Sequence, residues 1–374
     1  MNWKVMSVFL LVVLGCGGCG GSGGSGESGG NSGLSTSDNL LKKIELGELI
    51  FDDENLSTPT GQSCATCHDA DAGFADGSVD SVNPISEGAV ANTFGNRNAP
   101  TASYASLIPD FAFNVARNRY EGGLFLDGRA IDLADQAKGP FLNIKEMNNL
   151  SEADVVEKIR NASYAPLFME VFGDSSLDDA ALAYDLIAEA VAVYESTEEF
   201  QPFTSKFDLF LAGELALSES EERGFNLFKG AALCTECHKL EPTDRPLFSD
   251  FSYRNIGVPE NPNLDVETDL GLGGVLNIRS EDGKFRVPTL RNVALTAPYM
   301  HNGVISTLED IVKFYNRRIP DQCALSQFDG CWDEPEVGAN VEMTTVGDLS
   351  LFPEAEAEAD IVAFLKTLTD GYEL

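Results

Sequence analysis

Two short segments of this 374-residue chain place two cysteines three positions apart, with a histidine directly after the second cysteine. They are Cys64-Ala-Thr-Cys67-His68 and Cys234-Thr-Glu-Cys237-His238. The pattern C-x-x-C-H is typical of covalent c-type haem attachment: the thiols add to the two vinyl groups of one haem, and the histidine binds its iron. The sequence therefore predicts two haem c groups. Their attachment residues and proximal iron ligands would be Cys64, Cys67, His68, Cys234, Cys237 and His238.

Other uses of closely spaced cysteines fit this chain less well. A structural zinc site would need four ligands brought together. A thioredoxin-like redox pair would sit in a βαβ pattern, which the sequence lacks. The chain has only three histidines, and two of them belong to the motifs. Two haem sites are therefore the favoured interpretation.

The elements that position these motifs form an internal repeat. The segment Gly47–Phe51 precedes the first motif and Gly224–Phe228 the second, with the same Gly-x-x-x-Phe frame. Both are predicted to be helices that lead into a haem loop. A closing helix is predicted for the first half around Leu182–Val193. The closing helix of the second half is indicated by apolar residues at helical spacing, namely Ile361, Val362, Leu365 and Leu368.

The predicted fold is all-α, because little of the chain alternates as strands should. Each half has about the size of a cytochrome c domain. We therefore expect two cytochrome c-like domains, each around one covalent haem c, packed against each other. Their predicted extents are residues 38–205 and 206–374.

The N-terminus predicts export. The largely apolar run Val5–Leu14 is too short to span a bilayer and is typical of a signal peptide, predicted over residues 1–15. The Val-Leu-Gly before Cys16 resembles a lipobox and predicts a lipid on that cysteine; ordinary cleavage without a lipid is the alternative. A Gly/Ser-rich tether over residues 16–37 would follow. We expect a protein of the periplasm or cell envelope that is anchored through this lipid.

The charge of the chain limits its partners. A net charge of −35 argues against nucleic acid and against adsorption to anionic lipid. It favours steering of a basic partner, although general surface acidity with no such partner is the alternative. Another cysteine pair, Cys323 and Cys331, predicts a disulfide in an oxidising compartment.

Further segments resemble the bacterial dihaem cytochrome c peroxidase/MauG family over nearly the whole mature chain. In order they are Arg97–Thr101, Asp127–Ala130, Gln136–Pro140, Glu146–Asn148, Val287–Val293 and Thr296–Gly303. The resemblance implies that hydrogen peroxide reacts at the N-terminal haem. It implies that electrons enter at the C-terminal haem from a small donor such as a cytochrome c or a cupredoxin. A calcium ion between the haems and a homodimer are further implications.

The resemblance also assigns roles to single residues. Gln136, Pro140 and Glu146 would line the distal side of the N-terminal haem, where a carboxylate can move a proton between the two peroxide oxygens. By itself, Glu146 would be taken for a solvated acid at a helix start. Calcium would be bound by oxygen ligands. The protein part of that site would be Asn98 and the backbone carbonyls of Thr296 and Pro298.

The ligand opposite His238 decides the subtype. His301 lies outside the haem motifs and could be a distal iron ligand, but the resemblance instead implies a supporting role near the C-terminal haem and the calcium. Where typical family peroxidases have a methionine ligand, this chain has Tyr315, as in the MauG branch. A phenolate stabilises ferric iron and lowers its potential. The alternative is a packed Tyr315 with Met343 or Met300 on the iron.

The N-terminal haem is predicted to have an open sixth position. Many family peroxidases carry a second histidine after the first motif, and this chain has none between His68 and Arg97. The family tryptophan before Asp-Gly-Arg, which relays electrons between the haems, is replaced by Leu126. Direct tunnelling or another aromatic residue would have to serve instead.

The sequence thus predicts a dihaem c-type peroxidase that reduces hydrogen peroxide to water. MauG-like oxidation of a residue on a partner protein is the second interpretation, favoured by Tyr315 and the open haem. A dihaem electron carrier without turnover is the third, and the distal pair Gln136 and Glu146 argues against it.

Overall fold

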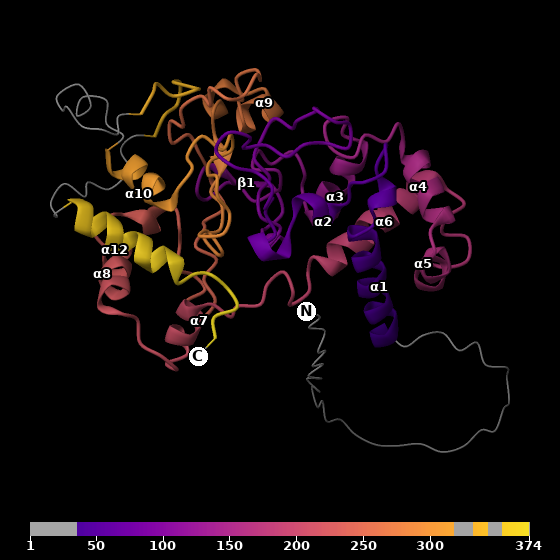
Figure 1. The fold of residues 1–374 in the computed structure, drawn as a ribbon, viewed down its shortest axis with the longest axis horizontal. Helices are drawn as coiled ribbons and strands as arrows, with labels where there is room; N and C mark the ends of the chain where they lie inside the picture. The colour runs from indigo at the N-terminus through magenta and orange to yellow at the C-terminus, as the bar shows by residue number, and fades with distance from the viewer. Residues whose placement is uncertain (1–35, 318–331, 343–353, 374) are drawn as a thin grey trace, which may run out of the picture.

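The computed structural model describes residues 36–317, 332–342 and 354–373, and most of their regular structure is helical (Figure 1). The first group of helices is α1 (Thr36–Phe51), α2 (Cys64–Cys67), α3 (Leu133–Leu142), α4 (Glu152–Asn161), α5 (Ala165–Phe172) and α6 (Ala180–Tyr194). The second group is α7 (Lys206–Leu211), α8 (Glu219–Lys229), α9 (Leu272–Leu276), α10 (Leu308–Arg317) and α12 (Glu354–Lys366). In Figure 1, helices α1 and α3 to α6 lie on one side of the molecule, and α7, α8, α10 and α12 lie on the other.

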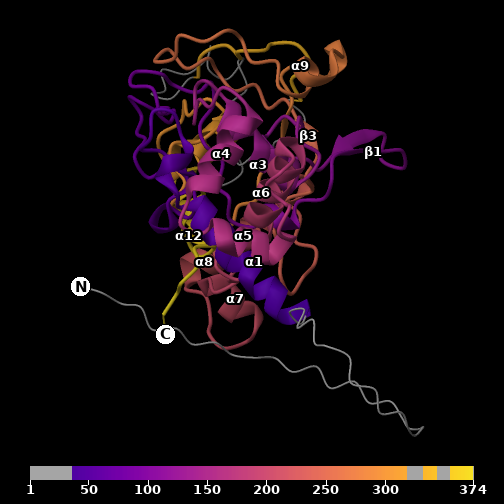
Figure 2. The same cartoon turned by 90° about the vertical axis from the view of Figure 1, so that its right-hand side faces the viewer.

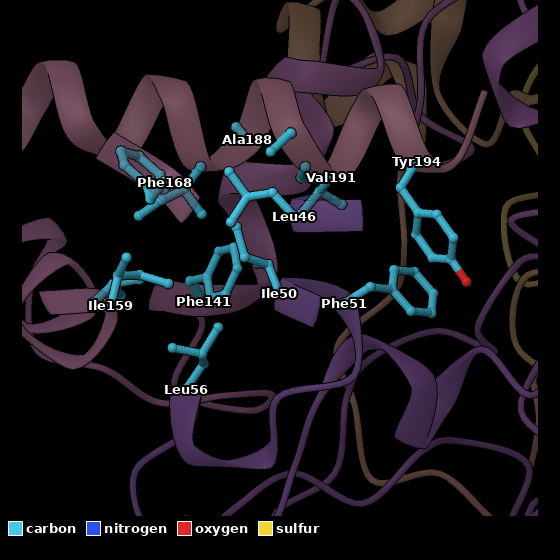
Figure 3. Packing of buried hydrophobic residues seen from close by; sticks show 14 of the residues in the cluster. Leu46, Ile50, Phe51, Leu56, Phe141, Ile159, Phe168, Ala188, Val191 and Tyr194 are labelled. Atoms are coloured by element: carbon cyan, nitrogen blue, oxygen red, sulfur yellow. The ribbon is translucent and has the colours of Figure 1, made fainter. Parts of the chain in front are cut away.

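The first hydrophobic cluster forms where α1 packs on α6 (Figure 3). Leu46 and Ile50 of α1 are at most 1% exposed and face Val191 of α6. Gly47 lies at the crossing point, where a Cβ would collide with the backbone carbonyl of Ala190. The first glycine of the repeat therefore permits two helix backbones to approach closely.

The second cluster repeats this packing with α8 on α12. Gly224 of α8 lies against the backbone carbonyl of Asp360, again too close for a Cβ. Phe228 and Phe364 pack with their ring centroids 5.1 Å apart. The predicted entry and closing helices of both halves are thus present. The second closing helix ends at Lys366, and Leu368 just beyond it is still fully buried.

Local signals explain where helices α7 and α8 begin. Ser205 caps α7 and Ser218 caps α8, and in each case the acid three residues later completes a capping box. The acid in α7, Asp208, also forms a bidentate ion pair with Arg291, at 2.6 and 2.8 Å. The start of the second half is therefore tied to the loop that carries the Val287–Val293 segment.

The all-α prediction holds for most of the described chain but missed two short antiparallel sheets. One pairs β1 (Ala112–Asn114) with β2 (Arg119–Glu121), and the other pairs β3 (Tyr253–Arg254) with β4 (Phe285–Arg286). The β1–β2 hairpin projects from the body of the molecule (Figure 2). Strands of two or three residues are too short to give an alternating pattern, which is why the sequence did not reveal them.

Three predictions fall outside the described residues: the signal peptide, the lipid on Cys16 and the disulfide between Cys323 and Cys331. The tether lies outside them too, except for its last two residues, which open α1. Among the helices that the structure describes, none is both long and apolar enough to cross a bilayer.

Candidate functional site

The first cysteine motif lines a cavity of about 830 Å³, here called the N-terminal cavity. Cys64 and Cys67 are the first and last residues of the short helix α2, and they form no disulfide with each other. The Nδ1 atom of His68 lies 2.9 Å from the backbone oxygen of Phe74. A carbonyl can only accept a hydrogen bond, so Nδ1 carries the proton and Nε2 keeps its lone pair for a metal.

The second motif lines a separate cavity of about 300 Å³, the C-terminal cavity. Cys234 begins a 3₁₀ turn that Cys237 directly follows, and these two cysteines also form no disulfide. The Nδ1 atom of His238 lies 2.7 Å from the backbone oxygen of Phe248. The two halves therefore hold their histidines in the same tautomer by the same kind of hydrogen bond.

These two sites fit covalent haem better than zinc. Each histidine is half-buried, and the desolvation of its ring lowers the imidazole pKa more than its hydrogen bond to a backbone carbonyl raises it. A neutral imidazole is the form that binds metal. The two cysteine pairs line different cavities, so they do not converge on one four-ligand site. Within the described ranges, no group of three or more His, Cys, Asp or Glu residues gathers as a metal site.

The predicted distal residues line the N-terminal cavity together. Gln136 and Pro140 lie on α3, and Glu146 follows that helix. The amide of Asn143 donates a 2.8 Å hydrogen bond to the Glu146 carboxylate. Burial raises the pKa of Glu146, and this outweighs the lowering by the nearby charge of Arg129 and by the Asn143 hydrogen bond. A carboxyl group with a raised pKa is suited to proton transfer.

The predicted calcium ligands all line the C-terminal cavity. Asn98 is buried and lines both cavities, while Thr296 and Pro298 line the C-terminal one. The Asn98 side-chain amide donates to the backbone oxygen of Pro84 at 2.9 Å, and its backbone amide donates to that of His301 at 2.8 Å. In the described part of the chain, no donor bonds to the Asn98 amide oxygen or to the carbonyls of Thr296 and Pro298. These oxygens suit a hard cation such as calcium.

His301 is buried at the edge of the C-terminal cavity. Its Nε2 atom lies 2.9 Å from the Glu336 carboxylate, and its ring stacks on Phe285 with centroids 3.9 Å apart. Glu336 also accepts a 2.7 Å hydrogen bond from the backbone amide of Asp269. With Nε2 engaged by a carboxylate, the geometry favours a supporting role for this histidine over iron ligation.

Tyr315 of α10 lines the C-terminal cavity with His238, and Met300 lines it as well. Met343 lies outside the described residues. Tyr315 and Met300 therefore both stay candidates for the second iron ligand.

The wall between the cavities is aliphatic where the family has its tryptophan. Leu126 lines both cavities, and Phe125 lines the N-terminal one. The Arg129 guanidinium lies 3.8 Å above the Phe125 ring. No readily oxidised side chain stands at this position.

Sequence reasoning missed an ionic network between the cavities. Arg97 bonds Asp269 at 2.6 and 2.8 Å and Asp127 at 2.6 Å. It also missed Glu195, a buried acid in the N-terminal cavity whose pKa burial raises to about 8. Arg97 and Asp127 both lie in segments that carry the family resemblance, but nothing in the sequence indicated that Arg97 pairs with Asp269.

Comparisons with known proteins place these features in a family. A family model described as di-haem cytochrome c peroxidase matches residues 41–216. The methylamine utilization protein MauG of Paracoccus denitrificans is 38% identical over 341 residues, which cover 87% of this chain and 88% of that protein. A cytochrome c551 peroxidase of Nitrosomonas europaea is 34% identical over 277 residues, 73% of this chain and 72% of that protein.

Solved structures of related proteins agree with this family assignment. The diheme peroxidase BthA from Burkholderia thailandensis superposes with a TM-score of 0.78 at 34% identity, covering 88% of this chain and 86% of that one. A MauG-like protein associated with microbial copper homeostasis superposes with a TM-score of 0.67 at 27% identity, covering 88% and 90%. These matches confirm the predicted family and an enzyme of the oxidoreductase class. The chain belongs to the di-haem cytochrome c peroxidase/MauG family.

Proposed function

We propose that this protein reduces hydrogen peroxide to water in the N-terminal cavity, with electrons from a small redox protein relayed through the C-terminal haem. The observation that carries this proposal is that Gln136, Pro140 and Glu146 line the same cavity as Cys64, Cys67 and His68. A pure electron carrier has no need of a half-buried acid in the cavity that holds its histidine ligand.

The chemistry assigns a definite task to Glu146. Reduction of one hydrogen peroxide to two waters consumes two electrons and two protons, and the haem iron supplies the electrons when bound. The Glu146 carboxylate takes a proton from one peroxide oxygen and delivers it to the other, which then leaves as water. Gln136 positions the peroxide, and Asn143 holds the carboxylate in place.

Glu146→Gln tests the proposal. The peroxide reaction should slow by about 10²–10⁴-fold, the usual contribution of a positioned proton-transfer group, while both haems stay attached. The rate in the parent should rise with pH through the raised pKa of Glu146, because only the carboxylate accepts a proton, and this rise should vanish in the variant. Exposed Glu152 on α4 offers the matched control, Glu152→Gln, which should leave both rate and pH profile unchanged. An unchanged rate in Glu146→Gln would remove this residue from the mechanism.

The second candidate function is peroxide-dependent oxidation of a residue on a partner protein. It is favoured by Tyr315 in the C-terminal cavity and by the 38% identity to a MauG protein. The spectrum of the ferric protein separates the subtypes: a five-coordinate high-spin haem with a low-spin His/Tyr haem supports the MauG-like form. A methionine or bis-histidine signature would exclude Tyr315. Peroxide consumption with and without reduced cytochrome c then distinguishes turnover as a peroxidase from oxidation of a partner.

Calcium belongs to the same proposal. Asn98, with the carbonyls of Thr296 and Pro298, would hold the ion beside the wall between the cavities. Chelation should change the haem spectra, and calcium, but not magnesium, should restore them, because magnesium binds poorly without near-ideal octahedral geometry. Spectra that ignore chelation would count against the site.

We further propose two haem domains, residues 38–205 and 206–374, in a periplasmic or envelope protein anchored through Cys16. The two hydrophobic clusters support this division, because one runs from Leu46 to Phe200 and the other from Phe207 to Leu368. Cys16→Ala should release the protein from membranes into the soluble periplasmic fraction. A protein already soluble before the change would refute the anchor, and light scattering would test the proposed homodimer.

A further inference from the structure

Arg286 occupies an unusual position in this molecule. It ends strand β4, pairs with Tyr253 of β3, and bonds through its backbone amide to the Leu126 carbonyl at 2.7 Å. Its side chain is buried, and it lines both the N-terminal and the C-terminal cavity. Arg286 therefore stands in the wall that the two haem sites share.

Among the residues that the structure describes, none is an anionic partner of the Arg286 guanidinium. Its Nε atom is buried without a hydrogen bond, and no described residue forms an ion pair with it. The Arg286 guanidinium carbon lies 5.9 Å from the centroid of the Phe251 ring, and Tyr253 is close enough to affect its charge. The other deeply buried arginine, Arg291, is paired with Asp208 at 2.6 Å. The wall thus holds a cation whose counter-ion is not supplied by the described chain.

Leaving that cation unpaired would be costly. A buried charge without a partner destabilises a folded protein, because its lost hydration is not replaced. Burial lowers the pKa of Arg286 to about 10, so the group is still charged at neutral pH. An anion within reach of the guanidinium is therefore expected in the assembled protein.

Asp269 is the one described carboxylate that lines both cavities with Arg286, and it already has a cationic partner; the haems would bring further carboxylates. Asp269 is bound to Arg97, and Glu336 is bound to His301. Each haem attached through its vinyl groups carries two propionate carboxylates on the opposite edge, away from the cysteine loop. Among the residues that line both cavities, Arg286 is the only cation. A guanidinium can bond a carboxylate on each side of its planar fork.

We propose that Arg286 is a carboxylate-binding residue shared by the two haems, pairing with a propionate of each and coupling their redox potentials. The inference rests on the two bound haems and not on whether they serve a peroxidase or a MauG-like reaction. A positive charge near a haem favours its reduced form, which carries one more electron. One shared cation should therefore raise both potentials together.

Redox titration of the full holoprotein tests this, with absorbance and paramagnetic resonance to separate the haems. Arg286→Gln should shift the midpoint potentials of both haems to more negative values. The control is Arg254→Gln: Arg254 lines only the C-terminal cavity and pairs with Glu342 at 2.7 Å. That variant should leave the potential of the N-terminal haem unchanged. An unchanged potential of the N-terminal haem in Arg286→Gln would overturn the proposal. So would Arg254→Gln shifting both haem potentials as much as Arg286→Gln does.

Arg286→Lys keeps the proposal testable if the glutamine variant fails to assemble. Lysine preserves the charge but loses the planar fork. Both potentials should stay close to those of the parent, while the propionate-bending bands in the resonance Raman spectra of both haems should shift. Propionate bands that match the parent at both haems would show that Arg286 does not bind these carboxylates. Neither readout depends on catalytic turnover.

Discussion

The ion pair between Asp208 and Arg291 should hold the second half of the protein together. The Arg291 side chain is fully buried, and Asp208 accepts two hydrogen bonds from it at 2.6 and 2.8 Å. Asp208→Asn keeps the size of the side chain and removes its charge. Arg291 then keeps a 2.9 Å bond to the Pro246 carbonyl, a long 3.5 Å contact to the Ser205 hydroxyl and at most one bond to the uncharged amide oxygen of the new asparagine.

We expect this change to cost about 3–5 kcal/mol, because it leaves a buried charge without its counter-ion. The lower end is more consistent with the surroundings, since the guanidinium lies 4.7 Å from the Phe203 ring and 5.4 Å from the Tyr104 ring. These cation–π contacts do not involve Asp208, so they still stabilise the guanidinium after the change and limit the loss of stability. Urea unfolding followed by circular dichroism measures the effect as a shift of the midpoint at constant slope.

Two further variants separate charge from packing. Glu309 and Lys366 form an ion pair at 3.1 Å with side chains 52% and 56% exposed, so Glu309→Gln should cost less than about 1 kcal/mol. Combining Asp208→Asn with Arg291→Met should recover part of the loss, since the unpaired charge is then absent. A loss below about 1 kcal/mol for Asp208→Asn alone would refute the reasoning.

Three other outcomes are expected. Gly224→Ala should cost about 1–3 kcal/mol, because its Cβ would meet the backbone carbonyl of Asp360, whereas Gly338→Ala, with open space around it, should stay within about 0.5 kcal/mol in the same urea assay. Stability should fall in acid through Asp208. Burial raises the pKa of its carboxyl group, but the hydrogen bonds and charge of Arg291 lower it by more, so the pKa in the folded protein lies below the ordinary value. The contribution of Asp208 to the free energy of unfolding is complete above the unfolded pKa of about 3.9 and is lost as the pH falls toward the folded pKa. The free energy of unfolding of Asp208→Asn should therefore depend less on pH in this range. Tyr315→Met should raise the potential of the C-terminal haem in a redox titration if the phenolate binds its iron, and an unmoved potential would exclude it.

Local pattern was sufficient to predict the haem loops and the helices around them. The C-x-x-C-H spacing identified both motifs, and the Gly-x-x-x-Phe frame marked helices α1 and α8. The sequence could not show why those glycines are needed. The reason is the approach of α6 to Gly47 and of α12 to Gly224, over separations of more than 130 residues.

The contacts that tune the site escaped prediction for the same physical reason. His68 bonds a carbonyl six residues away and His238 one ten residues away, so the two loops share a hydrogen bond but not a spacing. The pair of Arg97 and Asp269 joins residues 172 positions apart. Such pairings depend on how irregular loops meet, and no periodicity in the sequence encodes them.

The two halves differ in the parts of the fold that are not repeated, and the proposed function assigns their different chemistry to those parts. Both halves bury a glycine-bearing helix against a closing helix, and both fix a histidine through its Nδ1 atom. This shared frame would give two bound haems the same kind of histidine ligand. The facing walls come from unrelated segments: α3 and the residues after it bring Glu146 to the first cavity, while α10 brings Tyr315 to the second. Exchanging the function of the halves would therefore require changes in these walls and not in the motifs that bind haem.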